Sequence, residues 1–97
     1  MKCLAAALLV LLAPGAFAAD VLKGGQIYRM HCASCHGASG ISTMPNAPSF
    51  ARGERMTQPD QMLLGSIRRG RGAMPGFFGV LSDRDTLDVI AYMRSMR

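Results

Sequence analysis

The sequence lacks the features that are typical of membrane, repeat and β-sheet proteins. Its N-terminal apolar run, residues 3–12, is well below the roughly 20 residues that a helix needs to cross a bilayer. No two segments alternate as paired β-strands would, and the chain carries no internal repeat. With 97 residues it has room for one domain at most. These absences leave a small all-α domain as the expected fold class.

The first residues follow the three-part pattern of a secretory signal peptide. A positive start at Lys2 precedes the apolar run, and a helix-breaking Pro-Gly pair separates that run from Ala16-Phe17-Ala18, an A-x-A cleavage site. We therefore predict that residues 1–18 are a cleaved signal peptide and that residues 19–97 form a soluble periplasmic domain. Cleavage after Ala19 and a retained anchor are the alternatives.

Cysteine is scarce in the predicted mature domain. Cys3 belongs to the leader, and because it precedes the apolar run it cannot end a lipobox, which excludes a lipoprotein. Only Cys32 and Cys35 remain, in about 79 residues with a net charge of roughly +4. So small a domain usually needs a covalent cross-link or a bound group to be stable. A disulfide between residues three apart would close too small a loop to stabilise the domain much. Something else must complete the core.

Helical apolar spacing occurs in three segments, residues 21–34, 59–69 and 83–96. Thr57 is the expected N-cap of the second segment and Gly70 its C-terminal stop. Ser82 with Asp85 approximates a capping box for the third. Long loops, residues 36–57 and 70–81, separate the helices, and a small domain with such loops normally wraps them around something.

The motif with the clearest chemistry is Cys32-Ala33-Ser34-Cys35-His36, which matches the C-x-x-C-H signature of covalent c-type haem attachment. Residues three apart on a helical turn face the same way, so both sulfurs can reach the two vinyl groups on one haem edge. His36 can then place its imidazole under the iron. A bound macrocycle would also supply the missing core.

Three other interpretations of the motif remain open at this point. A thioredoxin-like redox site needs a βαβ scaffold that the chain lacks, and a plain disulfide is the second alternative. A zinc site would draw His31, Cys32, Cys35 and His36 from six consecutive residues, whereas zinc sites normally combine two separated ligand pairs.

A methionine is the expected second axial ligand, because Met with His is a common pair in cytochromes c. Met74 is our choice among seven candidates: it lies in a loop before the last helix, stiffened by Pro75 and flanked by glycines that let the backbone approach a flat ring. Met44 is the rival, but only eight residues separate it from His36.

These residues resemble class I cytochromes c along nearly the whole mature chain. The resemblance implies three main helices around one haem c, with Gly24 at the crossing of the first and last helices against the aromatic Tyr92. It also implies that the Pro48 carbonyl, twelve residues after His36, accepts a hydrogen bond from the second imidazole nitrogen.

A narrower resemblance is carried by the segments CHGASG, MPNAPSFARGE, IRRG, AMP and LSD. They are similar to the small periplasmic cytochrome c encoded with the cytochrome cd-type nitrite reductase of denitrifying bacteria (NirC-like). This resemblance implies a one-electron carrier, not an enzyme, that donates electrons to the reductase or to the making of its d-type haem. The alternatives are an assembly factor for the reductase, or a haem sensor or peroxidase if Met74 does not bind iron.

Arg68, Arg69 and Arg71 lie just before Met74. They either steer the protein toward an acidic docking surface or serve only helix-end complementarity and solubility. The expected partner is a redox protein. Neither nucleic acid nor stable membrane insertion is expected, and the expected state is a monomer.

Overall fold

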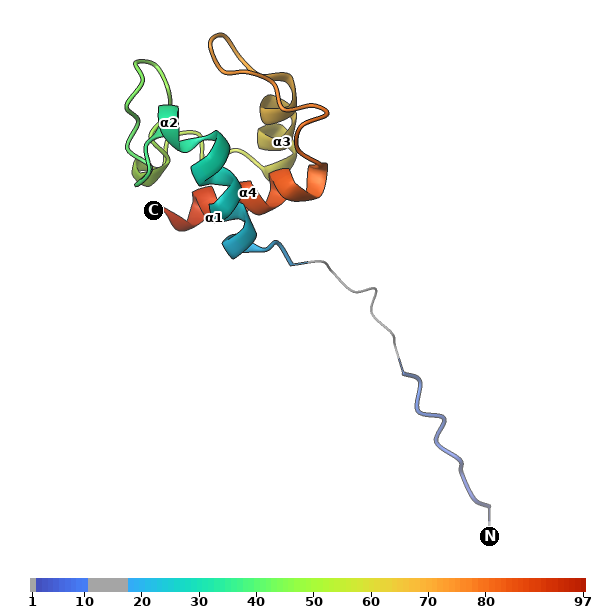
Figure 1. Ribbon diagram of the computed structural model, residues 1–97. Coiled ribbons are helices and arrows are strands. Elements are labelled where there is room, and N and C mark those ends of the chain that lie inside the picture. The colour runs from blue at the N-terminus through green and yellow to red at the C-terminus, as the bar shows by residue number, and fades with distance from the viewer. Residues whose placement is uncertain (1, 11–17) are drawn as a thin grey trace.

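The computed structural model describes residues 2–10 and 18–97, and helices joined by long loops make up its body (Figure 1). In chain order these are α1 (Val21–His31), α2 (Ala33–His36), the 3-10 turn η1 (Phe50–Arg52), α3 (Asp60–Arg69) and α4 (Asp83–Ser95). Within the two described ranges there is no β-strand, only an isolated bridge between Arg71 and Met74. The expected all-α architecture with three main helices is confirmed.

Part of the predicted leader is visible. Residues 2–10 form no helix and are exposed, whereas Ala16 and Phe17 of the predicted cleavage site lie outside the described residues. The signal peptide and the boundary at residue 18 therefore stay predictions. Across the described ranges, no helix is both long and apolar enough to span a membrane.

The packing of α1 against α4 forms the centre of the fold. Gly24 lies directly against the backbone of Asp88, so close that a Cβ at Gly24 would overlap the Asp88 carbonyl. The Tyr92 ring lies instead over Gly25, where a Cβ would come within 2.9 Å of it. The resemblance therefore predicted the helix crossing correctly, and Tyr92 lies at this crossing against the neighbouring Gly25.

Polar contacts fix the start of α1 beside α4. Asp20 caps α1, since its carboxylate accepts a hydrogen bond from the Lys23 amide at 3.0 Å. The Asp20 amide donates to the buried Asp88 carboxylate at 2.8 Å, and Lys23 forms an ion pair with Asp85 at 2.8 Å. These contacts tie residues 20–23 to α4.

The first predicted helix is wrong at its end. We expected it to run to about Ser34, but α1 ends at His31, and Cys32, whose φ of −119° is well outside the usual helical value, separates it from the next helix. The chain then restarts as the short helix α2.

The N-cap predicted for α3 is also wrong. Thr57 does not cap it; the helix begins after Pro59, whose backbone is extended. Gln58 precedes that proline, which disfavours helical geometry there and prevents an earlier start. The C-terminal stop at Gly70 is confirmed, since its φ is +74° and its amide donates to Ser66.

Helix α4 begins as expected, because the Ser82 hydroxyl accepts a hydrogen bond from the Asp85 amide at 3.0 Å. Near its other end, Arg94 donates to the carbonyls of Met56 and Gln58 at 2.6 and 2.8 Å and contacts Asp60 at 2.7 Å. This side chain fastens α4 to the segment that leads into α3.

The two longest loops rise to the same side of the α1–α4 pair, away from the N-terminal segment (Figure 1). One follows α2, and the other joins α3 to α4. The first carries Pro48 and the second carries Met74, so the fold brings the two predicted ligand-bearing regions to one side of the helix pair.

Candidate haem-binding site

The motif residues form one helical turn. The amides of Cys35 and His36 both donate to the Cys32 carbonyl, at 3.3 and 3.0 Å. Both cysteines are partly buried and form no disulfide. In the thiol form, burial, with a smaller effect of Cys35, raises the pKa of Cys32 to about 11.

The His36 imidazole is buried and held in a defined orientation. Its Nδ1 lies 3.0 Å from the Pro48 carbonyl oxygen, and its ring stacks on Phe50 with centroids 4.6 Å apart and planes 23° from parallel. A carbonyl can only accept, so Nδ1 carries the proton and donates. In the neutral ring, Nε2 is then the nitrogen without a proton, and a neutral imidazole nitrogen of this kind is the one that binds a metal.

Hydrogen bonds within the loop after α2 hold Pro48 in place. The Ser42 amide donates to the Ser49 hydroxyl at 2.9 Å, and the Ser42 hydroxyl donates to the Cys35 carbonyl at 3.1 Å. The buried Ser49 amide donates to a Glu54 carboxylate oxygen at 2.8 Å. The loop is thereby fastened to the motif turn at one end and to the segment after η1 at the other.

Tyr28 stabilises the end of the motif turn. Its side chain is fully buried, and its hydroxyl donates to the Gly37 carbonyl at 2.7 Å. Its ring contacts Tyr92, with centroids 5.3 Å apart. Desolvation raises the pKa of Tyr28 to about 12, so the hydroxyl stays a donor.

Met74 lies on the second loop, half-buried against the core. Its backbone is paired with Arg71 in both directions, at 2.9 and 3.0 Å. At Gly70 the chain doubles back so tightly that a Cβ there would lie 2.5 Å from the Gly76 amide. The Phe77 amide then donates to the Ile67 carbonyl at 2.9 Å, and this bond holds the second half of the loop on α3.

Met44, the rival ligand, belongs to the His36 side of the site. Its amide donates to the Cys35 carbonyl at 3.2 Å, and its side chain is exposed. Met74 lies on a separate loop, where its backbone bonds to Arg71 and not to the motif turn.

The zinc alternative is not supported. In the described part of the chain, no three His, Cys, Asp or Glu residues converge as a metal site. His31 packs edge-on against Phe77, with ring centroids 5.7 Å apart. The available donors, two neighbouring thiols, an imidazole with its Nε2 unprotonated and a thioether, fit a covalently attached haem.

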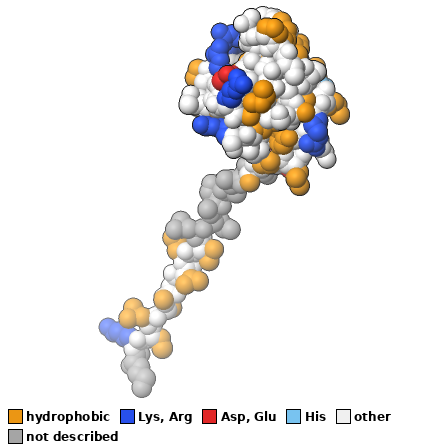
Figure 2. All heavy atoms as spheres, turned by 90° about the vertical axis from the view of Figure 1, so that its left-hand side faces the viewer, with side chains coloured by type: hydrophobic (Ala, Val, Ile, Leu, Met, Phe, Trp, Pro, Cys, Tyr) orange, Lys and Arg blue, Asp and Glu red, His pale blue; other side chains and the backbone are white. Residues whose placement is uncertain are grey.

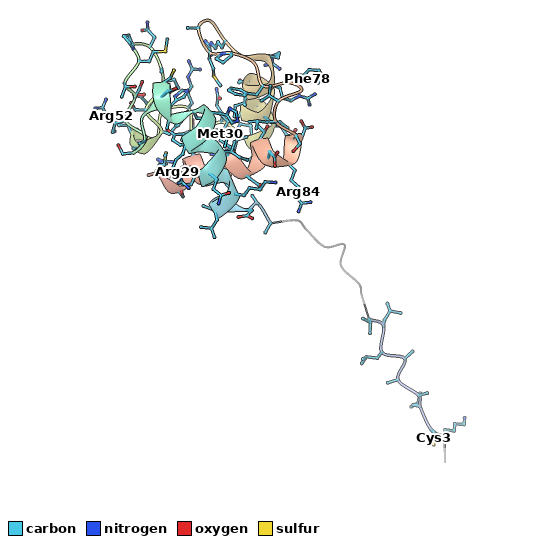
Figure 3. The ribbon with its side chains drawn as sticks, viewed as in Figure 1. Cys3, Arg29, Met30, Arg52, Phe78 and Arg84 are labelled. Atoms are coloured by element: carbon cyan, nitrogen blue, oxygen red, sulfur yellow. The ribbon has the colours of Figure 1, made fainter. Side chains whose placement is uncertain are left out.

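The arginines before Met74 differ in their contacts. Arg68 pairs with Asp83 at 3.2 Å and lies over the Phe78 ring, whereas Arg69 and Arg71 are exposed and form no ion pair within residues 2–10 and 18–97. Phe78 is 74 % exposed and projects on the α3 side, opposite Arg52 (Figure 3). On the side of the molecule that faces the viewer in Figure 2, basic side chains are more widespread than acidic ones.

Sequence reasoning missed the roles of Tyr28, Glu54 and Arg94. Each uses its polar group to bind a backbone atom in another segment. Residue type alone does not say which carbonyl or amide a side chain will reach. The presence of a tyrosine rather than a phenylalanine four residues before Cys32 was the one available signal for the first of these bonds.

Known proteins are similar to this chain in sequence and in fold. The family profile described as cytochrome C oxidase, cbb3-type, subunit III matches residues 19–93. Cytochrome c6 of Thermosynechococcus vestitus is 35% identical over 94 residues, 93% of this chain and 82% of that protein. Cytochrome c4 of Pseudomonas aeruginosa is 37% identical over 83 residues, 84% of this chain but 41% of that protein.

Solved structures of c-type cytochromes have a similar fold. Cytochrome c6 of the diatom Phaeodactylum tricornutum superposes with a TM-score of 0.66 at 30% identity, over 78% of this chain and 92% of that one. A c-type cytochrome named KustC0563 shares the fold with a TM-score of 0.68, at 24% identity over 76% of this chain and 96% of that one. The chain belongs to the class I c-type cytochromes, small electron carriers with covalently bound haem c.

Proposed function

We propose that Cys32 and Cys35 bind the haem through thioethers and that His36 and Met74 are its axial ligands. The observation that carries this proposal is the His36–Pro48 hydrogen bond, which directs one imidazole nitrogen away and leaves Nε2 for iron. The two loops supply the remaining residues from one side of the helix pair. Bound haem c supplies an iron that takes one electron from a donor protein and passes it to an acceptor protein.

The chain's own residues make this an electron-transfer site rather than a catalytic one. Phe50 and Pro48 fix the plane and protonation of the His36 ring, and the paired backbone of Arg71 and Met74 holds the second loop. With His36 and Met74 both holding a bound haem c, these residues would leave a substrate no open position, and the group would supply one-electron transfer alone.

A spectroscopic comparison tests the ligand assignment. Low-spin ferric protein with Met ligation shows a weak far-red sulfur-to-iron band. Met74→Ala should abolish that band, and Met44→Ala should leave it intact. Loss of the band in Met44→Ala alone would reject the assignment. A wild-type protein that is high-spin when ferrous and binds added ligands would instead favour the sensor or peroxidase alternative.

We further propose that the carrier works as a monomer in the periplasm and donates electrons to a cytochrome cd-type nitrite reductase. Support comes from the resemblance of the segments around His36, Pro48 and Met74 to cytochromes of nitrite reductase gene clusters. Exposed Arg69 and Arg71, beside the Met74 loop, suit an acidic docking surface because opposite charges raise the rate of encounter. An assembly role for the reductase is the alternative.

Stopped-flow mixing of the reduced protein with oxidised nitrite reductase tests the partner. We expect rapid reoxidation that slows as salt increases, and Arg71→Gln should slow it at low salt more than Arg29→Gln, which removes a charge from α1. Equal slowing by both variants would reject the docking role of Arg71. Binding to the reductase without electron transfer would favour the assembly role.

A further inference from the structure

One peptide group in the loop after α2 is hydrogen-bonded at both ends. The carbonyl of Pro48 accepts from His36 Nδ1 at 3.0 Å, and the amide of Ser49, in the same peptide unit, donates to a carboxylate oxygen of Glu54 at 2.8 Å. The Pro48–Ser49 amide therefore lies between the imidazole and a carboxylate. The three groups form a continuous hydrogen-bond chain.

The geometry of this chain is fixed by the turn that also places Phe50. Ser49 precedes η1, and Gly53, with φ +80°, reverses the backbone so that Glu54 returns to the Ser49 amide. Phe50, the first residue of η1, stacks on the His36 ring. The same short segment thus sets the ring's stacking partner and the position of the carboxylate.

A carboxylate on the amide hydrogen has a predictable electronic effect. Hydrogen bonds to ionised groups are stronger than neutral ones, and bonds in a chain polarise one another by about 10–30% each. The Glu54 charge draws the amide hydrogen and increases the negative charge on the Pro48 oxygen. That oxygen then accepts more strongly from Nδ1, which makes Nε2 a more electron-rich donor.

We propose that Glu54 is a positioning residue that tunes His36 through the Pro48–Ser49 amide and lowers the reduction potential of the cytochrome. The proposal deepens the assignment above and rests on His36 being an axial ligand. A more electron-rich imidazole stabilises the ferric form relative to the ferrous form. Removing the carboxylate charge should shift the ferric-to-ferrous ratio toward ferrous by roughly two- to fourfold at a fixed ambient potential.

Glu54→Gln in the haem-loaded protein is the direct test. The side-chain amide oxygen can still accept from the Ser49 amide, so the loop is retained while the charge is lost. We expect a higher reduction potential, an upfield shift of the Ser49 amide proton, and a change in the His36 Nδ1–H resonance. Both proton shifts report on the hydrogen-bond chain, which a merely structural role would leave unchanged.

Asp83→Asn is the matched control. It also removes one negative charge, but Asp83 lies on α4 and its hydrogen bond goes to Arg68, not to the loop after α2. Both carboxylates are exposed, but Asp83 can act on the potential only through solvent, so salt should suppress its effect. Glu54 acts through a direct 2.8 Å hydrogen bond to the Ser49 amide, which is shorter than the screening length even at about 1 M salt, so the Glu54→Gln effect should persist there. A potential change in Glu54→Gln that salt removes, or an unchanged Nδ1–H resonance, would overturn the proposal.

Wild-type protein separates failure of this proposal from failure of the ligand assignment. If His36 binds iron, its ring resonances are paramagnetically shifted in the ferric protein. Shifted resonances that do not respond to Glu54→Gln reject only the tuning role of Glu54. Unshifted His36 resonances in wild-type ferric protein reject the ligand assignment and the tuning role together. Glu54→Asp is the second variant if Glu54→Gln does not fold. Aspartate keeps the negative charge but is one methylene shorter, so its carboxylate lies farther from the Ser49 amide. The reduction potential should therefore rise by less than in Glu54→Gln, and no change in either proton resonance would overturn the proposal.

Discussion

The hydroxyl of Tyr28 reaches past the haem-attachment turn and donates a 2.7 Å hydrogen bond to the Gly37 carbonyl, the residue after the proposed iron ligand. Tyr28 belongs to α1, which packs on α4, and its own ring contacts Tyr92 of α4. The bond therefore couples the helix pair to the start of the loop that orients His36.

Tyr28→Phe should destabilise the haem-loaded protein by about 1–3 kcal/mol, because the change leaves a buried carbonyl without its donor. Urea unfolding measures the loss. Tyr92→Phe is the control, since the Tyr92 hydroxyl forms no hydrogen bond in the described part of the chain; its effect should stay within about 0.5 kcal/mol. Equal effects of the two variants would contradict a specific role for the Tyr28 hydroxyl.

Gly24→Ala should separate α1 from α4. The new methyl group would overlap the Asp88 backbone, which cannot move aside as a side chain can, and the expected cost is about 1–3 kcal/mol. In Gly65→Ala the methyl group would meet only the mobile end of Arg69, so the gain in helix propensity should stabilise α3 by up to about 1 kcal/mol. Opposite signs in chemical denaturation are the expected result, and stabilisation by both changes would refute the crossing argument.

Arg94→Lys should loosen the connection between α4 and the entry to α3. Lysine keeps the charge but cannot place donors on the carbonyls of Met56 and Gln58 and on Asp60 together. A loss of about 1–2 kcal/mol in thermal or urea unfolding is expected. Arg69→Lys, at an exposed position of α3, should change stability by less than about 0.5 kcal/mol.

The Lys23–Asp85 ion pair predicts a pH profile. The Lys23 hydrogen bond lowers the pKa of Asp85 below 3.8, so its stabilising effect is complete above that pH and is lost as pH falls through the lowered value. The bond to Asp85 raises the pKa of Lys23 above 10.5, so on the alkaline side the effect disappears as pH rises through the raised value.

Unfolding of wild type and Lys23→Gln at a series of pH values measures this effect. The stability difference between them should be constant across the neutral range and shrink at both extremes. Arg29→Gln should give a difference without such a profile. A wild-type advantage that persists below the acid transition would show that the ion pair is not its source.

The sequence predicted those features that depend only on neighbouring residues, such as helix starts and ends. Ser82 with Asp85 marked the start of α4, and Gly70 marked the end of α3, because a cap depends on the residues beside it. For the same reason the C-x-x-C-H motif predicted a c-type cytochrome, the family to which the chain belongs. Thr57 failed as a cap because the proline two residues later controls where α3 can begin.

Contacts between distant segments could not be predicted in this way. The resemblance placed a glycine at the helix crossing, yet it was the packing that set Gly24 against the Asp88 backbone and Gly25 under Tyr92. The Glu54–Ser49 bond joins residues only five apart, but it exists because η1 and Gly53 turn the chain back on itself. Periodicity contains no information about such a turn.

The hydrogen bond between the Asp20 amide and the Asp88 carboxylate joins residues 68 apart in the chain. Contacts of such long separation close large loops and tend to slow folding. Neither α1 nor α4 can bury its apolar face before the other is available, so the core is complete only once the residues of α4 can pack on α1. A truncation within α4 would therefore remove the partner of α1, and the earlier helices would lack a surface on which to fold.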